Sequence, residues 1–221
     1  MISRTTATLA LRARAIDTVV ATTGAVQLTA TTTGYSRADG GSFLDDNFHA
    51  GQELTPTLFT SNPVDIITSV TATTITTKNA RAAQAVGTRT LTVSLPAARA
   101  WENERFAKPS PIKPYVEESF VPATSQTITL PANGGQVQQT GLYVLRVYGL
   151  SGYGLAGLNS YVDALLLQFA PGTALTIGSD VLHVRTDTSV NAGQIIPLDN
   201  GWSVVTITIP WLARSLNQVA A

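Results

Sequence analysis

Apolar residues recur at helical spacing in two segments of the chain, residues 5–18 and 155–169. Positions three and four residues apart lie on one face of an α-helix, so both segments are predicted to be amphipathic helices. Thr5 or Thr6 is expected to cap the first helix, because its hydroxyl can accept from a free N–H group. The Pro-Gly pair after the second segment ends that helix. The two stripes are Leu9, Arg12, Ala13 and Ile16 in the first helix, and Leu155, Leu158, Val162, Leu165, Leu166 and Phe169 in the second.

Alternating apolar and polar residues predict several short strands in the first half of the chain. Val26 and Leu28 share one face while Gln27 and Thr29 share the other, as successive strand residues do. Short strands recurring roughly every 8–12 residues are typical of a small barrel or sandwich. The predicted strands span residues 19–33, 42–44, 51–54, 64–70, 73–77 and 89–95. The expected core comprises Val26, Leu28, Phe43, Phe48, Leu54, Val70, Ile75 and Leu91.

The second half of the chain differs in composition and pattern. Threonine-rich segments precede Pro96, whereas most aromatic residues and prolines follow it. Residues 101–115 are rich in proline and are expected to be extended, because a residue before proline avoids the helical region. Asn133-Gly134-Gly135 predicts a hairpin turn. The predicted strands span residues 116–121, 127–130, 142–148, 181–186 and 202–209, of which the last is the strongest.

Composition and charge exclude several classes of protein. The 221 residues carry 14 basic and 14 acidic side chains, so the basic surface of a nucleic-acid-binding protein is not expected. The absence of cysteine excludes disulfides and thiol chemistry. No run approaches the ~20 apolar residues of a membrane span, and Arg12 and Arg14 argue against a signal peptide. Only 13% of the residues are charged, which indicates that other subunits cover part of the surface.

The loop Gly152–Gly157, with the sequence GYGLAG, has the glycine spacing of a dinucleotide-binding motif. It follows a strand and opens a helix, and an acidic residue, Asp180, lies further along the chain. However, a central parallel strand should be continuously apolar, and the strand before the loop alternates and carries Arg146. The pattern therefore favours a flexible strand-to-helix loop. An NAD-binding oxidoreductase that uses this loop is kept as a distant alternative.

No other arrangement of residues supports catalysis. The acidic residues and histidine within residues 45–53 could bind a cation, but without the spacing of an EF-hand a solvated turn is favoured. Glu117 and Glu118 adjoin in a strand, so they point to opposite faces and cannot act as an acid–base pair. His183 stands alone in its strand. We therefore predict that the protein is not an enzyme and has no cofactor or catalytic metal.

A tryptophan segment in the extended region offers a different kind of site. A large aromatic residue beside polar groups either docks on the sheet or anchors a partner, because an extended segment cannot bury itself. Both interpretations stay open at this point. A second tryptophan follows Pro210, which cannot donate to a β-ladder and so marks a strand end or edge. The candidate interface residues are Trp101, Glu102, Asn103, Phe106, Tyr153 and Trp211.

Five short motifs follow one another through residues 99–214. They are Trp101-Glu102-Asn103 with Phe106, Pro114-Tyr115-Val116, Thr140-Gly141-Leu142-Tyr143, Phe169-Ala170-Pro171-Gly172-Thr173, and Gly201-Trp202 through Ile209-Pro210-Trp211. Each motif alone is loose, but their order resembles the tail terminator family of long-tailed bacteriophages. The chain departs from that pattern at Gly149-Leu150-Ser151, where relatives often carry a proline.

The front half is similar to a small β-domain that recurs in phage virion proteins. Its marks are Gly34-Tyr35-Ser36-Arg37, Gly41-Ser42-Phe43, Asp46-Asn47-Phe48 and Gly51. Asn47 stands where relatives usually have glycine, and asparagine tolerates the left-handed backbone that this turn needs. Terminator relatives usually begin with a helix that leads into the tryptophan segment. The resemblance therefore implies that residues 1–18 form this helix and pack on a domain of residues 96–221. Residues 19–95 are inserted between them and are expected to share few hydrogen bonds with the rest.

The resemblance also implies a fold class and a function. The fold would be α+β, with helices packed on a mostly antiparallel sheet, together with the small all-β barrel or sandwich. The protein would form a homohexameric ring at the head-proximal end of the virion tail, after assembly in the host cytoplasm. That ring would cap the tube of tail protein, stop its polymerisation and dock the head connector. DNA would pass through its lumen without sequence-specific contacts, and no membrane is involved. The alternative in the same setting is a neck or head-closure connector.

Overall fold

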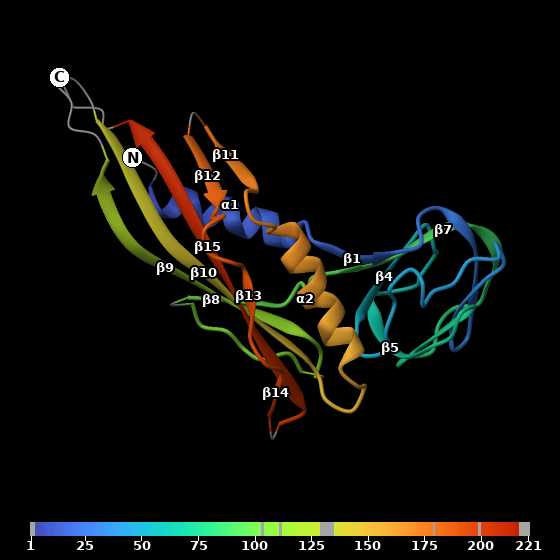
Figure 1. Cartoon of the computed structure of the whole chain (residues 1–221). Coiled ribbons are helices and arrows are strands. Elements are labelled where there is room, and N and C mark those ends of the chain that lie inside the picture. The colour runs from blue at the N-terminus through green and yellow to red at the C-terminus, as the bar shows by residue number, and fades with distance from the viewer. Residues whose placement is uncertain are drawn as a thin grey trace.

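The computed structural model describes residues 3–102, 104–110, 112–128, 135–178, 180–198 and 200–216. Within these residues the chain is mostly β, with two sheets and two helices (Figure 1). The first sheet contains β1 Val19–Thr22, β2 Val26–Thr31, β3 Gly34–Arg37, β4 Glu53–Thr57, β5 Asp65–Val70, β6 Thr74–Thr77 and β7 Gln84–Ser94. The second contains β8 Arg99–Trp101, β9 Tyr115–Thr127, β10 Gln136–Leu150, β11 Ala174–Ile177, β12 Asp180–Val184, β13 Asn191–Ala192, β14 Ile196–Pro197 and β15 Trp202–Leu216. The helices are α1 Arg4–Ile16 and α2 Ala156–Gln168, and neither could span a membrane.

The first sheet closes into a six-stranded barrel. Its strands are hydrogen-bonded in the order β7-β2-β3-β6-β5-β4, and β4 pairs back onto β7. The eleven-residue β7 also pairs with β1 through its last part. Alternate side chains along each strand point into the barrel and form its core. Six of the eight core residues predicted from the sequence are at most 2% exposed, and the other two, Val26 and Val70, are half-buried.

A turn replaces the strand that was predicted at residues 42–44. The Phe43 N–H donates to the carbonyl of Ala72, and the Phe48 N–H donates back to the carbonyl of Phe43. Both phenylalanines are fully buried and their rings meet edge to face at 5.7 Å. Asn47 adopts the expected left-handed conformation, with φ of 66°. The strand prediction was wrong because these aromatic residues enter the core from a turn.

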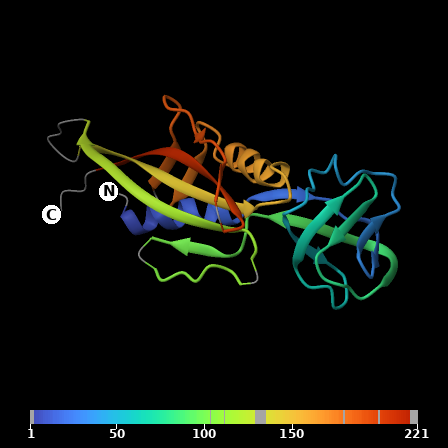
Figure 2. The same ribbon diagram turned by 90° about the horizontal axis from the view of Figure 1, so that it is seen from below.

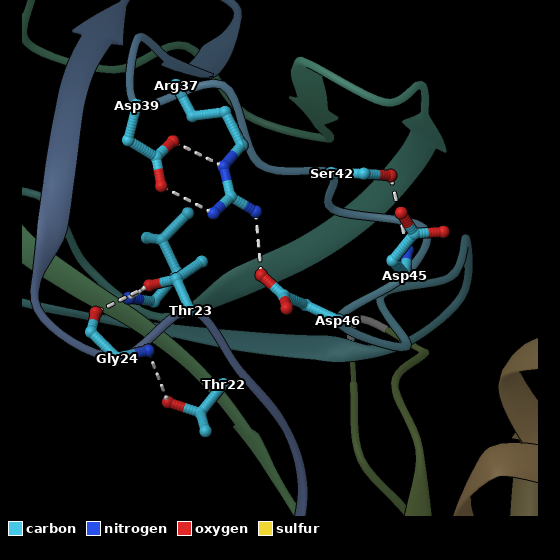
Figure 3. A network of polar contacts seen from close by, with 9 residues as sticks. Thr22, Thr23, Gly24, Arg37, Asp39, Ser42, Asp45 and Asp46 are labelled. Carbon is cyan, nitrogen blue, oxygen red and sulfur yellow. Dashed lines mark hydrogen bonds and ion pairs between the residues drawn. The ribbon is translucent and has the colours of Figure 1, made fainter.

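Arg37 at the end of β3 fastens this turn to the barrel (Figure 3). Its Nε and one terminal nitrogen donate to the Asp39 carboxylate at 2.7 and 2.8 Å, and the other terminal nitrogen donates to Asp46 at 2.6 Å. The bonds from Arg37 lower the pKa of Asp39 to about 2. Bidentate pairs between arginine and a carboxylate stabilise a contact and also fix its geometry. The turn is therefore held in one position by an arginine that is itself 5% exposed.

The second sheet curls into a half-barrel, in the order β11-β12-β15-β10-β9-β8, with β13 and β14 paired to β15. Its pairings among the described residues are antiparallel except β8 with β9, as the mostly antiparallel expectation requires. Helix α1 contacts β11 at one edge, and its Arg12 lies over the ring of Trp101 in β8 at the other. β9, β10 and β15 continue past α1 as a long arm (Figure 1). Two residues of the predicted hairpin turn, Asn133 and Gly134, lie outside the described residues.

Helix α1 begins earlier than predicted, and its cap is Ser3 instead of Thr5 or Thr6. The Ser3 hydroxyl accepts a hydrogen bond from the Thr6 N–H at 3.0 Å. The predicted stripe was also wrong, because Leu9 is 57% exposed. The buried positions are Ala7, Leu11 and Ala15, four residues apart. Small alanine side chains let the helix lie close to the sheet, which a pattern weighted toward large residues does not reveal.

Helix α2 joins the half-barrel to the closed barrel. Most of its predicted stripe is buried, with Leu158, Val162, Leu165 and Phe169 at most 7% exposed. Two further buried residues, Ser160 and Tyr161, face the barrel. The Gln52 amide donates to the Ser160 hydroxyl at 2.7 Å, and the Glu53 N–H donates to the Tyr161 hydroxyl at 3.2 Å. Lys113 also pairs with Glu53 across this contact. Two hydrogen bonds and one ion pair therefore fix the barrel against α2 and the segment before β9.

Gly157 allows this close approach, because a Cβ built on it would lie 2.5 Å from the carbonyl oxygen of Ala50. We expect Gly157→Ala to destabilise the chain by about 1–3 kcal/mol, the usual cost of overpacking. In a helix without that contact the same change would be stabilising by about 1 kcal/mol. Urea unfolding followed by tryptophan fluorescence measures the difference.

The matched control is Asn159→Ala, two residues further along α2 at an exposed position. It raises helix propensity without approaching the barrel and is expected to be neutral or slightly stabilising. If Gly157→Ala also proved stabilising, α2 would not rest on the Ala50 carbonyl in solution.

Candidate interaction surface

The tryptophan segment and α1 together form one continuous surface beside the half-barrel. β8 runs parallel to β9, with Trp101 opposite Glu118. The Arg12 guanidinium lies 3.8 Å from the centre of the Trp101 ring, and Trp101 is half-buried. A cation over an indole face is a favourable contact of about 0.5–2 kcal/mol. Trp101 therefore docks on the chain and still presents part of its ring to solvent.

A buried carboxylate lies beneath this surface. Glu118 is 2% exposed and accepts a hydrogen bond from Arg99 at 2.6 Å and another from the Tyr143 hydroxyl. Arg12 approaches the same carboxylate at 3.7 Å. Burial raises the pKa of Glu118 above its ordinary value, while the bonds from Tyr143 and Arg99 oppose that rise. Burial also holds the pKa of Tyr143 well above its ordinary value. The cluster ties α1, β8, β9 and β10 together.

A hollow of about 330 Å³ opens between α1 and the sheet edge. The aliphatic side chain of Leu9 and the guanidinium groups of Arg4 and Arg12 make its character mixed, apolar and cationic. Among the described residues no ion pair engages Arg4. The lining residues are Arg4, Thr5, Thr8, Leu9, Arg12, Glu102 and Phe120. This hollow, with the half-buried Trp101 next to it, is named the α1 hollow below.

The candidate interface residues do not form one site. Trp101 and Glu102 belong to the α1 hollow and its border, where the Glu102 carboxylate accepts from the Phe120 N–H at 3.3 Å. Phe106 packs on Tyr115 at 5.3 Å between ring centres. Asn103 lies outside the described residues.

The last two candidates serve packing inside the chain. Tyr153 packs over Gly51 of the barrel and so belongs to the contact with α2. Trp211 is 3% exposed and stacks on Phe120 at 5.1 Å. Trp211 is therefore a core residue and the interface assignment was wrong, because β15 turns this side chain toward α1. Leu9 and Arg4 line the α1 hollow and were not among the candidates, although the arginines within the first apolar stretch pointed to this helix.

The glycine loop before α2 does not have the setting of a dinucleotide site. β10, which precedes the loop, is antiparallel to both β9 and β15. Gly152 and Gly154 have left-handed φ values of 90° and 77°. Gly157 packs against the Ala50 carbonyl of the barrel. Asp180 is the first residue of β12 and pairs with Ile177 of β11. The glycines therefore shape a turn and a helix–barrel contact, and the oxidoreductase alternative loses its motif.

Two of the acidic residues considered as cation ligands are engaged in ion pairs. Asp46 pairs with Arg37, and Glu53 pairs with Lys113. The His49 ring bonds to the Asn47 side chain at 3.0 Å, and burial lowers its pKa. In the described part of the chain no three or more His, Cys, Asp or Glu side chains gather as metal ligands.

The two adjacent glutamates of β9 point to opposite faces, as predicted. Glu117 accepts from the Tyr148 hydroxyl at 2.8 Å on the more open face, and it pairs with Arg146 at 3.7 Å. Glu118 lies buried on the α1 side. The two carboxylates therefore cannot act on one substrate.

Comparison with protein families decides what kind of protein carries this surface. The model of the phage tail terminator proteins matches residues 79–211, more than half of the chain. The chain belongs to the phage tail terminator family. The match runs from just before β7 to the middle of β15, so it includes the tryptophan segment and α2 and leaves α1 outside. The family identification made from the ordered motifs is confirmed.

Solved structures and curated proteins give two further comparisons for this terminator-family chain. One solved protein chain is 25% identical, with a TM-score of 0.42, over 54% of this chain and 79% of that one. No curated protein matches. As a member of the terminator family, the chain is a structural component of a phage tail and its family is not one of enzymes.

Proposed function

We propose that this protein is the tail terminator of a long-tailed bacteriophage, forming a sixfold ring on the last ring of the tail tube. The family match carries the proposal. A tube that grows head to tail always offers a free surface at its end. A closed ring that fits this surface and presents a different one above stops growth without any bond chemistry. Its upper face then receives the head connector.

Two features of the chain support a role in assembly. Charged residues make up 13% of the sequence, and the centres of protein interfaces are depleted in charge. The described surface also carries large apolar side chains at high exposure, among them Leu9 at 57% and Leu167 at 79%. Both residues lie on the helices beside the half-barrel, and we propose the ring contacts for this unit because the family model matches most of it.

The barrel of residues 19–95 is proposed to be an inserted unit on the outer wall of the ring. A folded barrel in the lumen would obstruct DNA, whereas an outer position leaves the passage open. The contacts of α2 with Gln52 and Glu53 hold the barrel at one angle to the half-barrel. The division at residues 18 and 95 stays a proposal.

The test is a phage that lacks this protein, with the gene restored from a plasmid as the control. We expect tails of irregular, excessive length that carry no heads, because polymerisation has no stop. Restoration should return tails of uniform length. Tails of normal length without heads would instead identify a neck or head-closure connector. Normal, infectious virions would overturn both assignments. Negative-stain electron microscopy of tail lengths is the measurement.

A further inference from the structure

Helix α2 presents an outward row of side chains that the fold does not use. Leu155 and Leu167, at its two ends, are 54% and 79% exposed, and Asp163 between them is exposed. Among the described residues no ion pair engages Asp163. A leucine with four fifths of its surface in water adds little to the folding stability of the isolated chain, because only buried apolar surface stabilises.

The α1 hollow has the complementary character. Helix α1 contains three arginines and no acidic residue, whereas α2 contains one aspartate and no basic residue. Arg4, Arg12 and Leu9 line the hollow together with one carboxylate, Glu102, which already accepts from the Phe120 N–H. Asp163 and Leu167 are one helical turn apart, roughly 6 Å along the axis. A leucine entering the hollow would therefore bring an aspartate of the same helix close to its arginines.

We propose that α2 of one copy docks on the α1 hollow of the next copy, with Leu167 in the hollow and Asp163 facing Arg4 and Arg12. The proposal rests on the proposed ring and names the contact that closes it. In Figure 2 α1 lies beside β8 and α2 lies beside the barrel, and the Leu9 and Leu167 surfaces are on different helices. The same chain cannot join them at these surfaces, because its own α1 and α2 meet elsewhere, through Arg14 and Gln168.

Such a contact is heterologous, since it joins two different patches of identical subunits. Heterologous contacts form closed rings when the rotation between neighbours closes. Each subunit then uses both patches once. This property gives the contact a signature that a two-fold symmetric dimer contact lacks: blocking either patch breaks the ring, and two differently blocked chains can still form one contact.

The test uses Leu167→Glu and Leu9→Glu, each placing a carboxylate in one patch. Assembly of the purified full chain is followed by mass photometry and, on tail tubes, by electron microscopy of capped ends. Each variant is expected to raise the concentration for half assembly about tenfold or more, as loss of a central contact does. The matched control is Val86→Glu on the barrel, at the same 57% exposure as Leu9, with assembly unchanged.

An equimolar mixture of the two blocked variants is expected to form dimers and no rings, because only one productive contact remains. A charge exchange gives a second readout. Arg4→Glu and Asp163→Lys should each weaken rings of the wild-type size, and the chain with both changes should recover them. Recovery is not expected from a merely structural role of either residue.

The outcomes separate this inference from the proposed function. Rings of wild-type affinity from either leucine variant would overturn the docking and leave the ring proposal standing. Blocked variants that form no dimers when mixed would also overturn it, because the contact would not join α1 to α2. A wild-type chain that forms no ring, either free or on tubes, would overturn the ring proposal itself.

Discussion

Replacing Glu118 with leucine is expected to lower the free energy of unfolding by about 3–5 kcal/mol, the usual cost of removing one partner of a buried ion pair. Arg99, whose side chain is 7% exposed, would lose the carboxylate that now accepts its bond at 2.6 Å. The Tyr143 hydroxyl would lose its acceptor as well. Urea unfolding at neutral pH measures the effect.

Glu117→Leu is the matched control for this substitution. It makes the same chemical change on the preceding residue, whose side chain is 30% exposed and pairs with Arg146. Partly solvated ion pairs of this kind contribute about 0–1 kcal/mol. Equal losses for the two variants would show that the cluster around Glu118 contributes no more than a surface pair.

The pH dependence of stability is a separate readout of the same carboxyl group. Burial raises the pKa of Glu118, so the folded chain holds this proton more firmly than the unfolded chain does. The contribution of the group is then complete below the unfolded pKa, about 4.3, and declines as the pH rises through the higher folded pKa. Glu118→Gln cannot titrate, so the stability difference between wild type and this variant should change across that window and be constant above it.

Trp202→Ala is expected to cost about 3–5 kcal/mol, the range for removing a large aromatic side chain from a core. Trp202 is 5% exposed, its ring meets Tyr115 edge to face at 5.6 Å, and its Nε1 donates to the Lys113 carbonyl at 3.3 Å. The substitution removes the buried apolar surface, the contact with Tyr115 and the hydrogen bond to Lys113 at the start of β15. Thermal unfolding by circular dichroism measures the loss.

Trp101→Ala serves as the control, because this tryptophan is half-buried and rests on one arginine. Its loss of stability should be clearly smaller. If the ring proposal holds, however, it should weaken assembly more than Trp202→Phe, which keeps an aromatic ring in the core. A larger loss of stability for Trp101→Ala than for Trp202→Ala would reverse our assignment of core and surface.

The strands and the family could be predicted from the sequence because their signals are local. Period-two alternation located β10 and β15, and Leu28, Phe43 and Leu54 of the barrel core are fully buried as expected. Asn47 adopts the left-handed turn that its side chain permits. The ordered tryptophan and glycine motifs were sufficient to identify the terminator family.

The interaction surface depended on which side of each helix the tertiary structure covers. In α1 the half-barrel covers the face of Ala7, Leu11 and Ala15 and leaves Leu9 in water, a choice of face that the helical period alone does not make. In α2 the barrel covered Ser160 and Tyr161, which no apolar stripe would indicate. Leu167 was left exposed by the same packing.

What the sequence alone determined, therefore, is the long strands β10 and β15, the two helical segments and the family, because alternation, helical period and motif order are carried by neighbours along the chain. What only the tertiary structure decided is the closure of the barrel through β4 and β7, the burial of Trp211 and Glu118, and the exposure of the two helix faces. These features join residues distant in sequence, and their energies come from contacts that no local pattern contains.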